Sequence, residues 1–207
     1  MAPLLGRFGR RSRPAANAAL LDATVDALAG TLGLRDGHTA EHCDRVVLLA
    51  RRIGRQLGLA RLEQRDLDYA ARLHDIGKVG VPDAVLHKRG PLTDDEWDVI
   101  RGHAVCGAKL VERIPGLDRV ALIVRHHHER FDGDGYPDGM AGEAIPLGSR
   151  ILGVADAYVA MTEDRPYRRR RPGFEVDREL RNGAGSQFDP GVVNTLRDLI
   201  HLRQSVA

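Results

Sequence analysis

The stretch Leu73-His74-Asp75-Ile76-Gly77-Lys78 is the most informative part of this chain. A histidine followed directly by an aspartate is costly to bury unless both side chains are satisfied, and a metal ion satisfies both. Further candidate ligands flank this pair, since most of the nine histidines lie between His38 and His128. Besides His74 and Asp75, the candidates are His38, His42, His103, His127, His128 and Asp156. This clustering predicts a polynuclear metal site.

The bulk composition is that of an ordinary globular domain. With 207 residues, of which 43% are hydrophobic and 29% charged, the chain is long enough for one domain with a full core. Aromatic residues make up only 4%, so the core is expected to consist of helices packed through aliphatic faces. The net charge of +2 is too small to indicate a nucleic-acid polymer as partner.

Cysteine usage and hydropathy bear on the cellular compartment. The two cysteines, Cys43 and Cys106, form no CxxC pair and are typical of reduced thiols in a cytoplasmic protein. No stretch is long and apolar enough to span a membrane, because Asp22 and Asp26 interrupt the best candidate. We therefore expect a cytoplasmic protein without a membrane partner.

The chain divides into an arm, a first helix and a main domain. Residues 1–14 are rich in Gly, Arg and Pro and predict a flexible basic arm, or a linker from an upstream domain. Residues 15–34 predict an N-terminal helix that could pair with a second copy as a homodimer. Residues 35–203 form the main domain.

Apolar spacing predicts the helices. The expected helices cover residues 15–32, 39–57, 61–74, a segment starting at the capping box Thr93-Asp94-Asp95-Glu96, 117–128, 149–161, and a last one after Asp189-Pro190. Residues 79–92 and 131–139 are dense in turn residues and are expected to be loops. No segment alternates apolar and polar residues, so the predicted fold class is all-α.

Spacing alone leaves the histidine ligands open. His38 and His42 are four residues apart, which places both on one helix face at a chelating distance, yet two exposed histidines at a helix start have the same spacing. His126, His127 and His128 are consecutive and cannot all face one point, so two of them at most flank a metal cluster.

The carboxylates also have structural alternatives. His74 and Asp75 end an apolar helix and could be a core histidine beside a capping aspartate. Asp156 lies in the apolar stretch Val154-Ala155-Asp156-Ala157 and is costly to bury alone. A salt bridge with Arg150 or Arg165 would satisfy it without a metal.

The donor set indicates a chemistry. A ligand set of imidazoles and carboxylates without an obligatory thiolate suits Fe, Mn or Zn and differs from that of a structural, Cys-rich zinc site. We expect Cys106, three residues from His103, to be a core residue and not a ligand. Two or three such metals bridged by a hydroxide hydrolyse phosphoesters, because the hydroxide attacks phosphorus while the metals neutralise the phosphate oxygens. Lys78, one turn after His74 if the helix continues, could hold a phosphate oxygen or be a surface lysine.

Together these motifs resemble the HD-GYP domain, a subgroup of the HD phosphohydrolase superfamily. The matching segments occur in order over about residues 35–200. They are His74-Asp75-Ile76-Gly77-Lys78, Leu86-His87-Lys88 with Leu92-Thr93, His103 with Gly107, His127-His128-Glu129, Asp132-Gly133-Asp134-Gly135-Tyr136-Pro137, Arg150-Ile151-Leu152 with Val154-Ala155-Asp156, Asp164-Arg165-Pro166-Tyr167-Arg168 and Phe188-Asp189-Pro190.

The resemblance implies a single-domain helical bundle of the HD type with a GYP loop insertion, so that residues 35–203 would be the catalytic domain. It implies a phosphodiesterase that hydrolyses cyclic di-GMP to pGpG and/or GMP with two or three divalent metal ions, Fe or Mn. The two core metals would be bound by His74, Asp75, His103, His127, His128 and Asp156. His42 matches a ligand of a third metal, and His38 stands where other members have a glutamate.

The resemblance also implies the residues that act on the substrate. Arg165 and Arg168 fall where the family contacts phosphates or bases, and a planar guanidinium suits a phosphate. In the segment Gly135-Tyr136-Pro137, the tyrosine could stack on a guanine. Asp75 and Lys78 are the expected catalytic residues, and Lys78 would also bind substrate.

The sequence leaves open the acid that protonates the leaving group, the substrate, and the class of function. Glu129 and Asp132 are candidates for the acid that protonates the leaving group, by proximity alone. The substrate could be another cyclic dinucleotide such as cyclic GMP-AMP. In a different class of function, the domain would be a signalling module whose GYP loop docks a diguanylate cyclase partner.

Overall fold

The chain folds as a bundle of helices, which confirms the all-α prediction. The computed structural model describes residues 13–33, 40–164 and 169–204. The α-helices are α1 (Arg13–Gly33), α2 (Ala40–Gln56), α3 (Arg61–Leu73), α4 (Asp83–Leu86), α5 (Asp94–Val111), α6 (Asp118–Arg125), α7 (Leu147–Thr162), α8 (Gly173–Gly183) and α9 (Pro190–Gln204), and the 3₁₀ helices are η1 (Ile76–Gly80) and η2 (Gly142–Ala144). Among these residues there is no β-strand, only an isolated bridge between Ala184 and Phe188.

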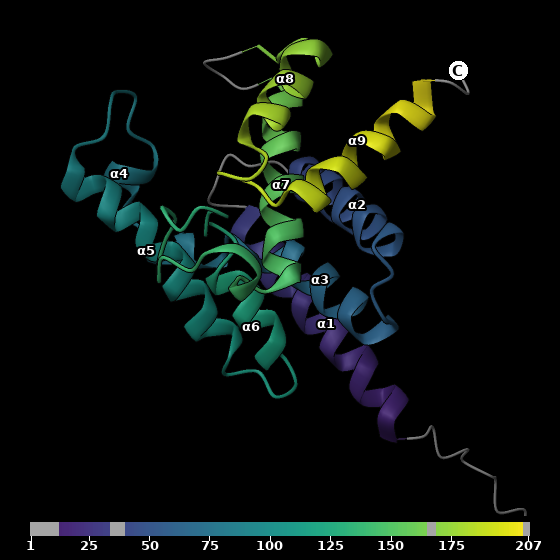
Figure 1. Cartoon of the computed structure of the whole chain (residues 1–207). Coiled ribbons are helices and arrows are strands. Elements are labelled where there is room, and N and C mark those ends of the chain that lie inside the picture. Colours follow the sequence, from purple (N-terminus) through teal and green to yellow (C-terminus); the bar gives the residue numbers. More distant parts are fainter. Residues whose placement is uncertain (1–12, 34–39, 165–168, 205–207) are drawn as a thin grey trace, which may run out of the picture.

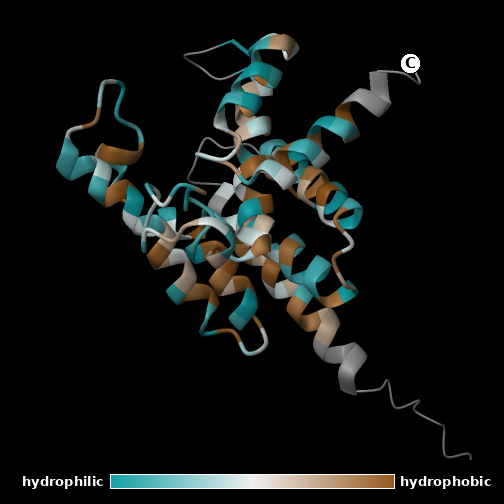
Figure 2. Cartoon of the chain, in the orientation of Figure 1, coloured by the Kyte–Doolittle hydropathy of each residue, from teal (hydrophilic) through white to brown (hydrophobic). Residues whose placement is uncertain are grey.

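Helix α7 runs through the middle of the molecule and packs against α2, α3, α6, α8 and α9 (Figure 1). Its apolar residues, including Ile151, Leu152 and Val159, are buried in the core. Brown apolar faces of the surrounding helices turn towards this centre, and teal polar faces turn outwards (Figure 2). Burial of aliphatic faces therefore organises the bundle around α7.

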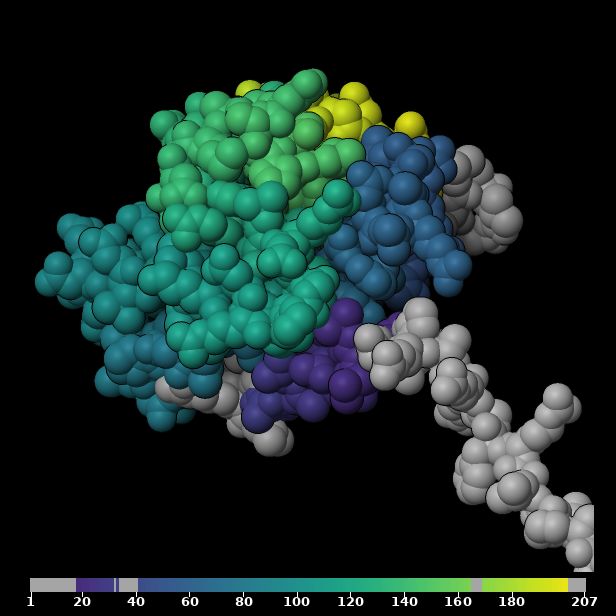
Figure 3. All heavy atoms as spheres, turned by 90° about the horizontal axis from the view of Figure 1, so that it is seen from below, coloured from purple at the N-terminus to yellow at the C-terminus, as the bar shows by residue number. Residues whose placement is uncertain are grey.

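Helix α1 lies at the edge of the bundle and packs against α3 and η1 (Figure 3). Val25, on the side facing the core, is fully buried. The two carboxylates that interrupt its apolar face have partners on α3, because Tyr69 donates a hydrogen bond to Asp22 and Arg72 pairs with Asp26. No helix in the described part of the chain is long and apolar enough to cross a membrane.

Two helix starts follow the sequence signals. At the start of α5, the Thr93 hydroxyl accepts from the Glu96 amide, and the Glu96 carboxylate accepts from the Thr93 amide, which is the predicted capping box. At the start of α9, the Asp189 carboxylate accepts from the amides of Gly191 and Val192, and Pro190 is the first helical residue. Both predictions are confirmed.

Two expectations about boundaries were wrong, and one helix was missed. The predicted loop 79–92 contains the one-turn helix α4, in which the Val85 and Leu86 amides donate to the Pro82 carbonyl. The helix expected over 117–128 ends at Arg125, and the next three residues form a turn. Helix α8 was not predicted at all, because its short apolar pattern rests on Val176 and Leu180 alone.

Candidate metal centre

The histidine–aspartate pair lies where α3 gives way to η1. Helix α3 ends at Leu73, and His74 is its C-cap. The chain can turn here only because Gly77 has no side chain, since a Cβ on Gly77 would lie 1.9 Å from the carbonyl oxygen of His103 and 2.4 Å from the amide nitrogen of Gly107. This close approach brings η1 onto α5 and sets the first two candidate ligands beside His103.

Three histidines have their outer ring nitrogen fixed by the backbone. Each donates its Nδ1 proton to a carbonyl three residues earlier: His74 to Ala71 at 2.8 Å, His103 to Ile100 at 2.6 Å, and His127 to Val124 at 2.6 Å. A carbonyl only accepts, so Nδ1 carries the proton in each ring. The neutral ring then presents the lone pair of Nε2 to the centre of the cluster, as a metal-binding histidine does.

Two of these Nε2 lone pairs face carboxylate oxygens. Nε2 of His74 lies 3.4 Å from Oδ2 of Asp75, and Nε2 of His103 lies 3.6 Å from Oδ1 of the same residue. Among the described residues, Nε2 of His103 and Nε2 of His127 are buried and have no hydrogen-bond partner. Buried acceptors that face one another are unfavourable unless a cation lies between them. The donor set therefore fits a divalent metal.

The candidate ligands form two groups of three, each with its ligand atoms within 4.8 Å of one another. One group contains the side chains of His103, His127 and His128, and the other contains His42, His74 and Asp156. Asp75 contacts one ring of each group, His103 of the first and His74 of the second. The predicted ligands in the described residues thus converge from α2, α3, α5, α7 and the turn after α6.

The structure adds Glu163 to the residues found by sequence. Its carboxylate accepts a hydrogen bond from Nδ1 of His42 at 2.6 Å, and Nε2 of that ring lies 3.2 Å from Oδ1 of Asp156. Burial tends to lower the pKa of His42, but the two carboxylates outweigh it, so the pKa is raised. Glu163 follows Asp156 by seven residues, two helical turns, but no local signal in the sequence links it to His42. Asp156 forms no ion pair with Arg150 or with any other arginine among the described residues.

Burial and neighbouring charges shift the pKa values of side chains at the centre of the cluster. Burial alone would raise the pKa of Asp75, but His74, Lys78 and His103 hold it well below its ordinary value. Burial lowers the pKa of His128 to about 4 and holds that of His127 well below its ordinary value, and the neighbouring imidazoles act in the same direction. At neutral pH, Asp75 is therefore ionised and His127 and His128 are neutral, the protonation states that metal binding needs.

Lys78 contacts the centre by a different route from the one expected. Helix α3 does not continue to it, and it lies in η1, where its ammonium group pairs with Oδ2 of Asp75 at 2.7 Å. Its side chain is 14% exposed, so it is not a surface lysine. The salt bridge holds a positive charge next to the proposed metal ligands.

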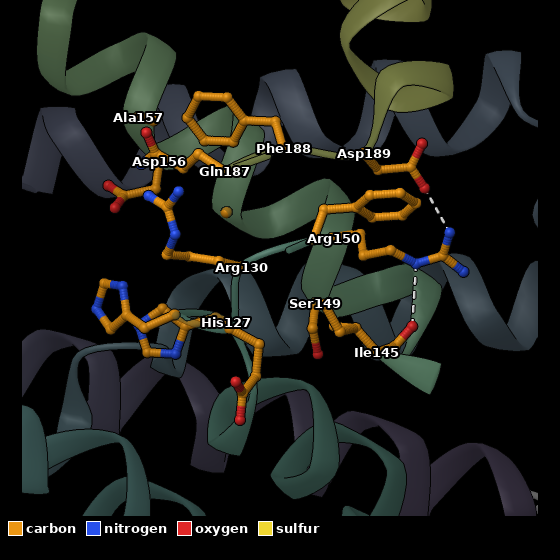
Figure 4. A pocket seen from close by; sticks show the side chains of 14 residues that line it. His127, Arg130, Ile145, Ser149, Arg150, Asp156, Ala157, Gln187, Phe188 and Asp189 are labelled. Atoms are coloured by element: carbon orange, nitrogen blue, oxygen red, sulfur yellow. Dashed lines mark hydrogen bonds and ion pairs between the residues drawn. The ribbon is translucent and has the colours of Figure 1, made fainter. Parts of the chain in front are cut away.

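A cavity of about 190 Å³ opens beside the cluster. Figure 4 shows His127 and Asp156 at one side and Arg150 with Asp189 at the other, and Arg130 and Gln187 also line the cavity. Arg150 does not approach Asp156, because its guanidinium pairs with Asp189 and donates to the Ile145 carbonyl. Neither Arg130 nor Gln187 was predicted, because Arg130 follows the segment His127-His128-Glu129 and Gln187 precedes Phe188-Asp189-Pro190 without belonging to either motif.

The GYP loop is fastened to the end of α6 by charged groups. The Glu129 carboxylate accepts from the amides of Asp138 and Met140, at 2.7 and 3.1 Å. The Asp138 carboxylate in turn pairs with Arg125 and with Nε2 of His126. His126 thus faces the loop and not the cluster. Glu129 holds the loop, and Asp132 pairs with Arg130, so both candidates for the leaving-group acid have structural partners.

The loop brings Tyr136 to the cluster. Its ring packs on that of His128, with centroids 4.9 Å apart. Burial raises its pKa to about 12, so the phenol stays neutral. The bend requires Gly135, where a Cβ would lie 2.2 Å from the Arg130 amide nitrogen. Gly135 and Tyr136 therefore lie beside the cluster, and the role of Gly135, Tyr136 and Pro137 in binding the substrate stays a prediction.

Three predicted site residues lie outside the described residues. They are His38, Arg165 and Arg168. Their proposed roles in binding a third metal or the substrate remain predictions.

The sequence matches the HD domain family over residues 26–192, and the chain therefore belongs to that family, as the resemblance to HD-GYP domains indicated. It is 41% identical over 175 residues to the cyclic di-GMP phosphodiesterase response regulator RpfG of Xanthomonas campestris, covering 84% of this chain and 46% of the relative. It is 38% identical over 167 residues to a cyclic di-GMP phosphodiesterase of Thermotoga maritima, covering 80% and 45%. The chain thus spans less than half the length of these relatives.

Solved structures share the fold. A cyclic GMP-AMP specific phosphodiesterase of Vibrio cholerae superposes with a TM-score of 0.68 and 23% identity, over 86% of this chain and 48% of that one. The HD domain of the Listeria monocytogenes phosphodiesterase PgpH, in complex with cyclic di-AMP, superposes with a TM-score of 0.58 and 18% identity, over 87% and 96%. These similarities place the all-α bundle among HD-domain folds.

Proposed function

We propose that this chain is a metal-dependent phosphodiesterase that hydrolyses cyclic di-GMP to pGpG and/or GMP. The observation that carries the proposal is the convergence of backbone-fixed histidine Nε2 atoms on Asp75, since such a set of acceptors is satisfied by divalent cations. Two relatives of about 40% identity are named cyclic di-GMP phosphodiesterases, which supports the substrate.

The proposed ligands follow the two groups of side chains. We assign two divalent ions, Fe or Mn, to His74, Asp75, His103, His127, His128 and Asp156. Asp75 is the residue placed to serve both ions, because it contacts a ring of each group. His42 supports the second group through Asp156 and is the described candidate for a third ion, which His38 would complete. Such ions neutralise a phosphate and activate water as a nucleophile.

The remaining residues bind and orient the substrate. Lys78 places an ammonium group beside Asp75, where it can hold a non-bridging phosphate oxygen as a point charge. Tyr136 covers His128 at the mouth of the site, and Gly135 and Pro137 fix its position in the loop. Arg165 and Arg168 are proposed as further substrate contacts.

The test is product analysis with a matched pair of proteins. Wild-type protein is expected to convert cyclic di-GMP to pGpG or GMP, and Asp75→Asn is expected to lose activity at least about a hundred-fold, because even second-shell changes at metal sites cost ten- to a hundred-fold. The exposed Asp95→Asn, on the outer side of α5, should retain activity. Equal activity of wild type and Asp75→Asn would contradict the proposal.

A second substrate has a specific observation in its favour. The 3′3′-cGAMP-specific phosphodiesterase 3 of Vibrio cholerae is 33% identical over 184 residues, covering 89% of this chain and 40% of the relative. We therefore propose cyclic GMP-AMP as the alternative substrate, to be compared at equal concentration in the same assay.

A docking role remains a separate proposal. It is supported by the exposed GYP loop, whose charged residues Asp132 and Asp138 lie on the surface. In this reading the loop would bind a diguanylate cyclase domain, and the His74→Ala/Asp75→Ala double variant would abolish hydrolysis but keep that binding. We also propose a homodimer through α1, and a cytoplasmic location, which the two free cysteines favour.

A further inference from the structure

A second cavity, of about 400 Å³, adjoins the cavity of Figure 4. The two cavities share three lining residues, His128, Arg130 and Gln187. The second cavity is otherwise lined by side chains of α5 and the GYP loop. A cyclic dinucleotide whose phosphate lies at the histidine cluster would have to place its bases in spaces that adjoin the cluster, and this cavity is one of them.

The wall of this cavity is built for a flat ring. Trp97, on α5, is 45% exposed, a large apolar surface to leave in water. The Arg101 guanidinium, one turn further along α5, lies 5.9 Å from the ring centroid of Trp97 and 5.9 Å from that of Tyr136. Aromatic faces and a guanidinium plane are the groups on which proteins stack nucleobases. The three side chains thus form a stacking wall.

The edge of the same cavity carries a carboxylate. Asp134 lines it, and its side chain forms no hydrogen bond or ion pair with any residue that the structure describes. An ionised carboxylate only accepts hydrogen bonds. Guanine presents two adjacent donors on one edge, N1–H and the N2 amino group, whereas adenine presents an acceptor at N1. Arginine is the side chain that pairs with the guanine acceptors O6 and N7.

We propose that this cavity is a guanine subsite, in which the base stacks on Trp97, Arg101 binds its acceptor edge and Asp134 accepts from its N1–H and N2 amino group. The subsite rests on the proposed function, since it names the base of that substrate. It selects guanine over adenine, because adenine would set its N1 lone pair against the carboxylate. Arg101 is free to turn towards the base, as its only described ion pair, with Asp98, is exposed and 3.4 Å long.

The chain offers a direct probe, because Trp97 is its single tryptophan. Cyclic di-GMP, cyclic GMP-AMP and cyclic di-AMP are titrated separately into metal-loaded protein, and tryptophan emission is recorded in the mixing phase, before product accumulates. Hydrolysis of each dinucleotide is followed in parallel. The variants are Asp134→Asn, which keeps the size of the side chain but replaces one acceptor by a donor, and Asp95→Asn as the matched control on an exposed surface of α5.

The expected result is saturable quenching by cyclic di-GMP, much weaker quenching by cyclic di-AMP, and a roughly ten- to hundred-fold rise in Kd and KM for cyclic di-GMP in Asp134→Asn. The turnover number of that variant should change little, and Asp95→Asn should match wild type. Hydrolysis of cyclic di-GMP without a change in emission would overturn the subsite and leave the proposed function intact. Equal quenching by cyclic di-AMP would overturn the assignment of Asp134, and loss of both quenching and hydrolysis would overturn both proposals.

Discussion

Nε2 of His103 lies 3.6 Å from Oδ1 of Asp75, with no donor between them. The opposite side of the His103 ring is fixed, because its Nδ1 proton is donated to the Ile100 carbonyl. Two acceptors are therefore held face to face in a buried place, and His74 repeats the arrangement on the other oxygen of Asp75. Without a cation between them, these facing acceptors would destabilise the folded protein.

The first prediction concerns acid sensitivity of the metal-free protein. The pKa of His128 is about 4 in the folded state and about 6.5 when unfolded, so the unfolded chain binds more protons in between. Stability is then lost as pH falls from about 6.5 to about 4, by about 3 kcal/mol from this residue as an order of magnitude. The lowered pKa of His127 acts in the same direction. The lowered pKa of Asp75 adds a further loss only below about pH 4, and the raised pKa of His42 stabilises the fold as the pH falls towards about 6.5.

Chemical denaturation of chelator-treated protein at a series of pH values measures this loss. His128→Gln, which does not titrate, should show a shallower dependence on pH. A free energy of unfolding that is constant from pH 7 to pH 4 would contradict the burial of neutral imidazoles.

The second prediction concerns the approach of η1 to α5. Gly77→Ala would force a Cβ to within 1.9 Å of the His103 carbonyl oxygen, so we expect a loss of about 1–3 kcal/mol in the free energy of unfolding and a weaker metal site. Gly102→Ala, on the same helix α5 with nothing within 4 Å of its Cβ, should instead stabilise by about 0.5–1 kcal/mol. Thermal unfolding of the two variants measures these changes. Changes in stability of the same sign in Gly77→Ala and Gly102→Ala would contradict the close approach.

The third prediction concerns the link between α7 and α9. Asp189→Ala would leave Arg150 in a half-buried place without its carboxylate and would remove the cap of α9. We expect a loss of about 3–5 kcal/mol, the usual cost of breaking a buried pair from one side. Glu179→Ala removes an exposed pair with Arg171 and should cost less than about 1 kcal/mol. Comparable losses in the two variants would show that the Arg150 pair is not buried in solution.

The fourth prediction concerns Glu163 as a positioning residue. It holds Nδ1 of His42 and so directs Nε2 towards Asp156. Glu163→Ala should lower metal affinity by about ten- to a hundred-fold, with Asp164→Ala as the neighbouring exposed control. Metal titration with a competing chelator is the readout. An unchanged affinity in Glu163→Ala would mean that His42 needs no orientation.

The sequence predicted the parts of this molecule that depend on local signals. Thr93 and Asp189 predicted helix starts correctly, because a capping side chain accepts hydrogen bonds from amides only two or three residues further along the chain. The ligand set was implied by the resemblance to HD-GYP domains and not by local spacing, and the structure places His74 and Asp156 in one group and His103 in the other.

What escaped prediction depends on contacts between distant segments. Glu163 and His42 are 121 residues apart, and nothing in either neighbourhood names the other. Helix α6 ends at Arg125 because the next turn aims His126 at Asp138 and His127 at the cluster, so tertiary contacts override helical propensity there. The stacking wall of Trp97 and Tyr136 likewise forms only when the GYP loop lies on α5.

The most direct test of the central claim is to purify the protein anaerobically and to measure metal content and cyclic di-GMP hydrolysis on the same sample. The account predicts two or more Fe or Mn ions per chain, together with turnover to pGpG or GMP that is lost when the metal is removed and restored when it is returned. A protein that binds no divalent metal even after reconstitution would contradict the assignment of the histidine and aspartate cluster.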